Sequence, residues 1–364
     1  MSLMKWTGQA SRRLAVILFA GIVPLCAVAG ARAETQPIAA LTELTGNFSR
    51  FGEDCRRGYE IALAASTDAP KVLFGDHQSD PKVGLSEFHR LVDVERANLV
   101  VSSRSPVVLA LNPLSVKQGI PLIGVISHPR FVKENANAVR IFPSSVDEAS
   151  ALAAYAMAQG DRKIATISLE DEFFLGLRDE FEVRVGKDKI VFSETVAPTE
   201  QDFASLLLRV KAKSPDAIFA NVGPAQMTQL VQKIRQAGLN VRLYSNFVAG
   251  TEDTRKALGS GAEGIVFAEV VFEKPGYLKA VAAVSKNSFL SPLGYSCYVA
   301  MNYALQLEQV AQSRQISLGD SIAMVREVPT FDGPISIVDR EAKFEVVAKT
   351  IRNGAVERAL GSGQ

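Results

Sequence analysis

The chain has 364 residues, of which 47% are hydrophobic and 22% charged, and its 40 basic residues nearly balance its 39 acidic ones. This length is sufficient for two domains, each with its own hydrophobic core. Basic residues do not gather into a block, which argues against nucleic acid or an anionic membrane surface as a partner.

Residues 1–33 have the features of a secretory signal peptide. Three basic residues, ending with Arg13, precede the apolar run "LAVILFAGIVPLCAVAG" (14–30), and "ARA" (31–33) places small residues before the expected cleavage point. The apolar run is short for a stable membrane span. We therefore expect a mildly acidic mature chain in the periplasm, without stable insertion in the membrane.

Short apolar segments rich in β-branched residues alternate with longer segments of helical period. The expected strands span residues 36–43, 71–76, 97–103, 121–125, 163–170, 190–197, 216–222, 241–247 and 263–270. The expected helices span residues 53–66, 83–96, 105–118, 145–159, 175–185, 201–213, 224–237 and 251–258. Apolar strands between helices are typical of parallel sheets covered on both faces, so we predict an α/β protein.

A boundary is predicted at Pro143, after which the series of strands and helices starts again. The alternation stops near residues 269–277, followed by one long helix (291–313) and a hairpin-rich end (331–358). This pattern predicts two Rossmann-like lobes joined by several crossovers, with a cleft between them. We assign 34–143 plus 273–329 to lobe 1 and 144–272 plus 330–364 to lobe 2.

Cysteine and histidine usage argues against a metal site. Cys55 and Cys297 are the two cysteines of the mature chain; they could pair in an oxidising compartment, but two buried free thiols are the reading that we favour from the sequence. His77, His89 and His128 lack the spacing of metal ligands. We expect no metal and no cofactor.

The loops that follow the expected strands hold the candidate ligand-binding residues, because ligands of open parallel sheets bind at the carboxyl ends of the strands. In "SSRSP" (102–106), Arg104 lies at the start of a helix, where unpaired N–H groups favour an anion, and its guanidinium suits a carboxylate. Ser105 is expected both to cap this helix and to contact the ligand. Phe51, Phe173 and Phe247 lie in three further loops and suit a ligand with an apolar body.

Motifs of common enzymes are missing from the sequence. It contains no G-x-S-x-G, P-loop or H-E-x-x-H motif, and no complete G-x-G-x-x-G motif between a strand and a helix. We therefore expect a binding protein and not an enzyme.

Nearly all of the mature chain resembles the type I periplasmic solute-binding proteins of the branched-chain amino acid family, which are the extracytoplasmic components of ABC importers. The resemblance rests on ordered segments, among them "IAALTELTGNFSRFGEDCRRGYEIAL" (38–63), "FGDHQSDPKVGLSEFHRLV" (74–92), "LVVSSRSPVVLALNPLSVKQGIPLI" (99–123) and "TEQDFASLLLRVKAKSPDAIFANV" (199–222). It implies the type I periplasmic binding protein fold, closure of two lobes about a hinge, and the permease subunits of an ABC transporter as partners.

The resemblance also implies roles for individual residues. Phe51 would pack on the ligand, Ser105 and its neighbour Ser103 would bind the ligand carboxylate, and Ile126 and Ser127 would offer a backbone carbonyl and a hydroxyl. The second-lobe loops place these residues at the cleft: Phe173, Asn221, Asn246 and Phe247.

Two departures from the family pattern bear on the ligand. Amino acid binders of this family often carry an acidic group in the last of these loops, to pair with the ligand ammonium, but Ser245, Asn246 and Phe247 offer none. Arg104 is the second departure, because it adds a basic residue to the family pattern in its loop. Together they favour a small aromatic or aliphatic carboxylate held by Arg104, Ser105 and Ser127. A branched-chain or other amino acid, and a sensor protein on the same fold, are the alternatives.

Overall fold

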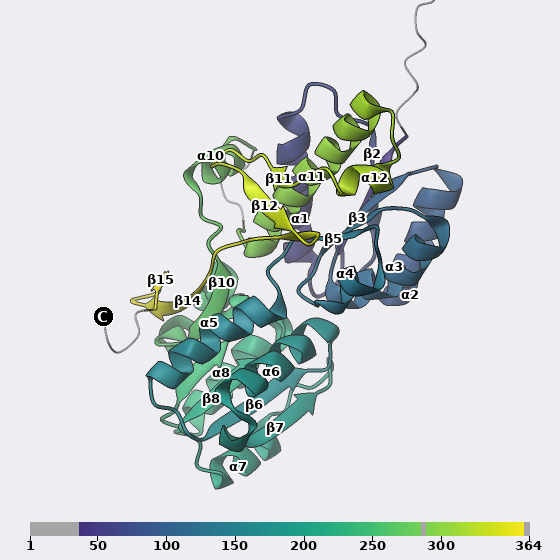
Figure 1. Ribbon diagram of the computed structural model, residues 1–364. Coiled ribbons are helices and arrows are strands. Elements are labelled where there is room, and N and C mark those ends of the chain that lie inside the picture. Colours follow the sequence, from purple (N-terminus) through teal and green to yellow (C-terminus); the bar gives the residue numbers. More distant parts are fainter. Residues whose placement is uncertain (1–35, 285–288, 360–364) are drawn as a thin grey trace, which may run out of the picture. The chain divides into compact units, whose positions relative to one another are not determined.

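The computed structural model describes residues 36–284 and 289–359 (Figure 1). The predicted signal peptide lies outside the described residues. Within them, no helix combines the length and the apolar character that crossing a membrane requires.

Two sheets organise the chain, and each has a parallel centre with antiparallel strands at one side. The first has the order β11-β12-β13-β5-β4-β3-β1-β2, and the second β15-β14-β10-β9-β8-β6-β7. The strands of the first sheet are β1 (Ile38–Thr42), β2 (Val72–Asp76), β3 (Leu99–Ser103), β4 (Leu122–Val125), β5 (Ala138–Arg140), β11 (Glu327–Val328), β12 (Ile335–Val338) and β13 (Glu341–Ala342). Those of the second are β6 (Ile164–Leu169), β7 (Ile190–Val196), β8 (Ala217–Asn221), β9 (Arg242–Ser245), β10 (Val266–Val270), β14 (Val346–Arg352) and β15 (Ala355–Arg358).

Helices connect the parallel strands and cover the sheets. They are α1 (Ser49–Ala64), α2 (Pro81–His89), α3 (Ser105–Gln118), α4 (Arg130–Glu134), α5 (Ser145–Ala158), α6 (Glu172–Val185), α7 (Ala204–Ala212), α8 (Pro224–Gln236), α9 (Glu252–Leu258), α10 (Pro275–Val284), α11 (Pro292–Arg314) and α12 (Leu318–Ile322). We refer to each sheet with its covering helices as lobe 1 and lobe 2, in chain order.

Alternate residues of the central strands pack on opposite faces of the sheet. In β1, Ile38 and Ala40 belong to a buried cluster with residues of α1 and α11, whereas Ala39 and Leu41 belong to a cluster with residues of α2 and α3. Both faces of the strand are therefore apolar, which explains why its sequence reads as a continuous hydrophobic run. The predicted α/β architecture is confirmed.

The chain passes between the two sheets three times, near residues 141–144, 271–274 and 343–345. The observed pairing differs from the expected assignment of residues 330–364 to lobe 2. Strands β12 and β13 extend the first sheet, through the pairing of Glu341 with Arg140, and only β14 and β15 join the second. Short hairpin strands carry no signal in their own composition for the sheet edge that they will join.

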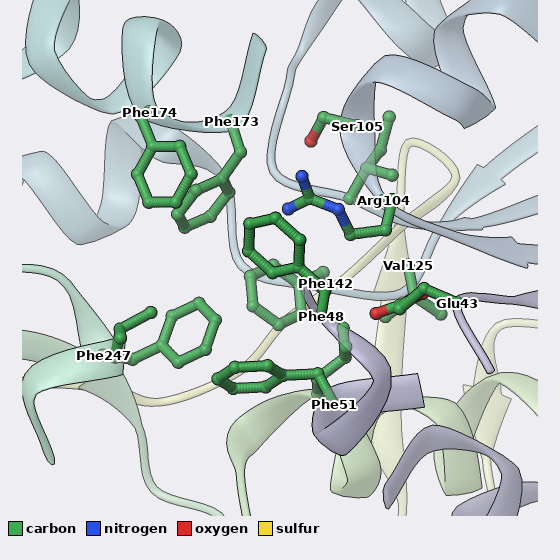
Figure 2. Close-up of a pocket in the computed structure, with 13 residues that line it drawn as sticks. Glu43, Phe48, Phe51, Arg104, Ser105, Val125, Phe142, Phe173, Phe174 and Phe247 are labelled. Carbon is green, nitrogen blue, oxygen red and sulfur yellow. The ribbon is translucent and has the colours of Figure 1, made fainter. Parts of the chain in front are cut away.

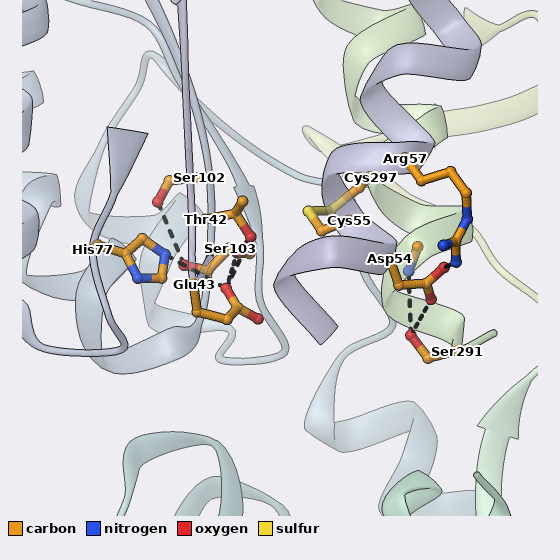
Figure 3. Close-up of a disulfide and its surroundings, with 11 residues drawn as sticks. Thr42, Glu43, Asp54, Cys55, Arg57, His77, Ser102, Ser103, Ser291 and Cys297 are labelled. Carbon is orange, nitrogen blue, oxygen red and sulfur yellow. Dashed lines mark hydrogen bonds and ion pairs between the residues drawn. A yellow bond between two sulfur atoms is a disulfide. The ribbon is translucent and has the colours of Figure 1, made fainter. Parts of the chain in front are cut away.

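Helices α1 and α11 lie side by side and are joined by a disulfide between Cys55 and Cys297, with 5.1 Å between their Cα atoms (Figure 3). The expectation of two free thiols is wrong. The helices approach closely because Gly58 faces the backbone of α11: a Cβ atom at Gly58 would lie 2.2 Å from the carbonyl oxygen of Gly294. Such a long-range approach of two helices is invisible in local sequence pattern.

Asp54 is completely buried at this contact between α1 and α11. It accepts hydrogen bonds from the Ser291 hydroxyl (2.6 Å) and from Arg57. Burial outweighs both and raises the pKa of Asp54 to about 6. Between about pH 4 and pH 6 the folded chain therefore binds a proton that the unfolded chain has released, and the contribution of Asp54 to stability falls as the pH rises through this window.

We expect the Asp54→Asn variant to lose this pH dependence. The free energy of unfolding of the wild type, measured by urea denaturation from pH 4 to pH 7, should lose about 1–3 kcal/mol more than that of the variant as the pH rises. The exposed Asp339 provides a control, because Asp339→Asn makes the same chemical change without touching a buried group. Equal slopes for wild type and Asp54→Asn would contradict the assignment.

Candidate ligand-binding site

A cavity of about 40 Å³ lies where loops at the carboxyl ends of the strands of both lobes meet. Its walls are mostly apolar (Figure 2), and six of the lining residues are phenylalanines: Phe48, Phe51, Phe142, Phe173, Phe174 and Phe247. The polar residues at the cavity are Glu43, Arg104 and Ser105. A single buried water needs about 10–15 Å³ by the same measure, so a larger ligand requires the walls to move apart.

The rings of the two lobes contact one another around Phe247. Its ring centroid lies 5.7 Å from that of Phe51 and 5.6 Å from that of Phe173, both in edge-to-face geometry. Phe142 is 6.2 Å away. Rings in this arrangement offer both faces and edges to an apolar guest.

Arg104 crosses from lobe 1 to lobe 2. Its Nη2 atom lies 2.6 Å from Oδ2 of Asp171, and its guanidinium stacks on the ring of Phe48 with 3.9 Å between Cζ and the ring centroid. The Nε atom is buried and has no hydrogen-bond partner among the described residues. The guanidinium charge is thus balanced by Asp171, while one of its donors is unused.

The backbone of Arg104 is left-handed, with φ of +71°, at the junction of β3 and α3. A non-glycine residue adopts this conformation at a cost, and such residues cluster at functional sites. Arg104 is the N-cap of α3 but its side chain does not cap the helix.

Ser105 is the first residue of α3, so the expectation that it caps the helix is wrong. Its hydroxyl is buried, lies at the cavity and has no hydrogen-bond partner among the described residues. Pro106 follows and has no N–H group, so the first turn of α3 presents the N–H groups of Ser105 and Val107 at its positive end.

Glu43 follows β1 and is completely buried at the cavity. Its Oε2 atom accepts hydrogen bonds from the hydroxyls of Ser103 (2.5 Å) and Thr42 (3.0 Å), while Oε1 has no partner among the described residues. His77, also buried, places Nε2 3.6 Å from Oε2 (Figure 3).

A sequence model of the family described as "Periplasmic binding protein" matches residues 35–356. The chain belongs to the periplasmic binding protein family. The predicted resemblance to the type I periplasmic solute-binding proteins of the branched-chain amino acid family is confirmed by this match and by the relatives below.

The similar proteins bind more than one class of ligand. Leu/Ile/Val-binding protein homolog 3 of Brucella melitensis is 22% identical over 79% of this chain and 82% of its own. A leucine-binding protein of Thermotoga maritima has a TM-score of 0.80 at 18% identity, over 90% of this chain and 98% of its own. A solute-binding protein of Rhodopseudomonas palustris, solved with 4-hydroxybenzoate, has a TM-score of 0.75 at 18% identity, over 89% of this chain and 95% of its own. The two structures show that the fold is shared.

Six of the ten residues that the sequence suggests for the site line the cavity of this periplasmic binding protein: Phe51, Arg104, Ser105, Ile126, Phe173 and Phe247. Ser103 lies behind the wall and binds Glu43. Ser127 does not line the cavity; its carbonyl oxygen accepts hydrogen bonds from the Arg140 side chain (3.3 Å) and the Ser145 N–H (3.0 Å).

The two asparagines of the second lobe are engaged inside the protein. Asn246 donates to Oδ1 of Asn221 (3.1 Å), and its own Oδ1 accepts from the N–H of Val248 (2.9 Å). Asn221 donates to the carbonyl oxygen of Phe174 (2.6 Å). Both side chains fix the loops that carry Phe174 and Phe247, so they shape the cavity from behind.

Sequence reasoning missed Glu43, Phe48, Phe142 and Phe174 as cavity residues. The signal for Glu43 was present, because an acidic residue that directly follows a buried strand lies at the edge of the sheet where ligands bind. Phe142 comes after β5, on the first pass of the chain between lobes, and only the folded chain brings its ring to Phe247.

Proposed function

We propose that this protein captures a small organic carboxylate with an apolar body and delivers it to the permease subunits of an ABC importer. The observation that carries the proposal is the pair of buried donors at the cavity, Nε of Arg104 and Oγ of Ser105, neither of which has a partner among the described residues. Buried polar groups are normally hydrogen-bonded, so two donors that converge on one cavity suit a ligand acceptor.

The chemistry of these donors favours an anion. A guanidinium forms strong, charge-assisted hydrogen bonds with a carboxylate, and the start of α3 adds a partial positive charge. Asp171 accepts a hydrogen bond from Nη2 of Arg104 at 2.6 Å, and other donors of the guanidinium remain for a ligand.

The six phenylalanines favour an apolar body on the same ligand. They are contributed by both lobes, and a ligand enclosed by them would lose most of its contact with water. Leucine and 4-hydroxybenzoate, named for the Thermotoga and Rhodopseudomonas proteins, both combine a carboxylate with an apolar part.

Movement of the lobes accounts for ligand access in this proposal. The chain passes between the lobes three times, which permits a hinge, and the narrow cavity admits a ligand only when the lobes separate. The lobes then close over the ligand, and the permease recognises the closed form because the ligand has shifted the population toward it.

A thermal-shift panel tests the proposal. 3-Phenylpropanoate, 4-methylpentanoate, 4-hydroxybenzoate, phenylalanine and leucine are compared with 3-phenylpropanol and 4-methylpentanol, which have the same bodies without the carboxylate. A carboxylate present at 100 times its Kd stabilises the folded state by about 2.7 kcal/mol, so at least one should raise Tm by several degrees. Equal shifts with the alcohols, or no shift with any carboxylate, would contradict the proposal.

A further inference from the structure

We propose that lobe 1 carries a second binding site, which takes a small organic amine in its ammonium form. The site is a cavity between the end of α11 and the amino ends of β3, β4 and β5. It is separate from the cavity between the lobes, and the inference does not rest on the proposed function.

The position of this second cavity keeps it apart from the first. Its volume is about 690 Å³, and small-molecule sites commonly have about 300–1,000 Å³. Asn98, Pro121 and Asn137 line it and directly precede β3, β4 and β5. The first cavity lies at the carboxyl ends of the strands, and the five residues of β3 span about 15 Å. A small ligand in one cavity therefore does not fill the other.

Two buried hydrogen-bond acceptors line the second cavity without a partner. Glu308 of α11 is only 6% exposed, and its Oε1 atom has no partner among the described residues. The same is true of Oδ1 of Asn98. Rotation about the terminal bond of a glutamate side chain is broad, so either carboxylate oxygen can turn toward the cavity. A ligand that satisfies both acceptors has to be a hydrogen-bond donor.

The charges around the second cavity favour a cation. Among the described residues that line it, Glu308 and Asp320 are acidic and none is a lysine, arginine or histidine. Burial raises the pKa of Glu308, although hydrogen bonds with the side chains of Asn98 and Gln312 act in the opposite direction. The neighbouring groups therefore do not fully compensate the charge of this carboxylate. A ligand ammonium supplies both the opposite charge and three donors.

Two helices end at the second cavity and add to its negative potential. Gly119, which terminates α3, lies in the wall, and the last turn of α11 contributes Gln312. The carboxyl end of a helix carries a partial negative charge. The short helix α12 begins at the same place (Figure 1), but its first turn is capped by Ser317, which accepts from the N–H of Asp320 at 3.1 Å. The balance of helix ends therefore favours a cation.

The apolar part of the wall favours an organic cation over a metal ion. Ile120, Ala311 and Leu318 line the second cavity together with the acidic residues. Within the described residues, no group of three histidines, cysteines, aspartates or glutamates gathers to hold a metal ion. A primary amine with a short apolar chain matches both parts of the wall.

Calorimetric titration with pentylamine and 1-pentanol tests the inference, because the two molecules share a chain and differ in charge. We expect pentylamine to bind about tenfold or more tightly than 1-pentanol. Glu308→Gln removes the charge and keeps an acceptor, so it should weaken pentylamine about tenfold or more and leave 1-pentanol nearly unchanged. Glu327→Gln is the matched control: it makes the same change at an exposed residue of lobe 1 outside this cavity, and it should leave both affinities unchanged.

A second variant tests the position of the site without changing a charge. Ala311→Leu places a larger side chain in the wall of the second cavity and should weaken pentylamine about tenfold. This variant decides the question if Glu308→Gln does not fold, which its circular dichroism and Tm would reveal. Pentylamine that does not bind, that binds no more tightly than 1-pentanol, or that keeps its Kd in both variants would overturn the inference.

A competition experiment separates this inference from the proposed function. Pentylamine should bind with the same Kd when the cavity between the lobes is saturated with a carboxylate. Competition between the two would place the amine between the lobes and overturn the second site. Failure of every carboxylate to bind would refute the proposed function alone, because the variants at Glu308 and Ala311 test the second site without a carboxylate.

Discussion

Replacing Arg104 with alanine is expected to weaken binding of the carboxylate ligand by about 100- to 1,000-fold. The change removes donors to the ligand and leaves Asp171, which now pairs with Arg104 at 2.6 Å, as an uncompensated carboxylate beside the cavity. Truncating one partner of a buried charge pair costs about 2–5 kcal/mol, or about 30- to 5,000-fold in affinity, and the expected loss lies within this range. Calorimetric titration of wild type and variant with the tightest ligand of the panel measures the loss.

Two further variants separate the contributions of charge and geometry. Arg104→Lys keeps the charge but loses the fork of donors, so binding should be intermediate. Asp171→Asn keeps an oxygen that can cap α6 and releases Nη2 of Arg104, so we expect binding at least as tight as in the wild type. A Kd for Arg104→Ala within threefold of the wild-type value would remove Arg104 from the site.

Removing the disulfide between Cys55 and Cys297 is expected to lower the free energy of unfolding by about 2–5 kcal/mol. The bond joins residues 242 positions apart, so its loss releases a large loop in the unfolded chain. Urea denaturation of the Cys55→Ala/Cys297→Ala variant measures the change. Ligand affinity should be nearly unchanged, because neither cysteine lines the cavity.

Reduction of the wild type provides an independent control for the disulfide. In the presence of dithiothreitol, the wild type should unfold at the urea concentration at which the double variant unfolds, while the variant should not respond to the reductant. Equal stability of the oxidised wild type and the double variant would show that the bond adds nothing to stability.

The sequence predicted the fold well because its strands are buried on both faces. Segments such as Leu99–Ser103 are apolar throughout and lie between segments of helical period, and α3 begins and ends at the expected residues, Ser105 and Gln118. The sheet that β12 and β13 join was harder to predict. A short strand pairs with a sheet edge, and that edge is formed by distant parts of the chain.

Residues of the candidate site could be predicted where it was enough to know that their loop follows a strand and lies at the edge of the sheet where ligands bind. Phe51, Phe173 and Phe247 were expected at the cleft, and the structure brings their rings together. The pairing of Arg104 with Asp171 could not be predicted, since it joins two lobes and 67 positions of sequence. From the sequence alone, we expected the whole positive charge of Arg104 to be available to the ligand. Its pairing with Asp171 neutralises part of that charge.

The absence of an acidic group near Asn246 favoured a simple acid over an amino acid at the sequence level. In the structure, an acidic side chain does lie at the cavity, but it is Glu43 of the opposite lobe. The function of a residue in such a loop depends on which side chains the other lobe places against it, and that arrangement is a property of the fold.

A crystal structure of the protein with the tightest carboxylate of the panel tests the central claim most directly. We predict one ligand in the cavity, with its carboxylate within hydrogen-bond distance of the Arg104 guanidinium and the Ser105 hydroxyl, and its apolar body against Phe51, Phe173 and Phe247. A ligand bound elsewhere, or a carboxylate directed away from Arg104 and Ser105, would contradict the account.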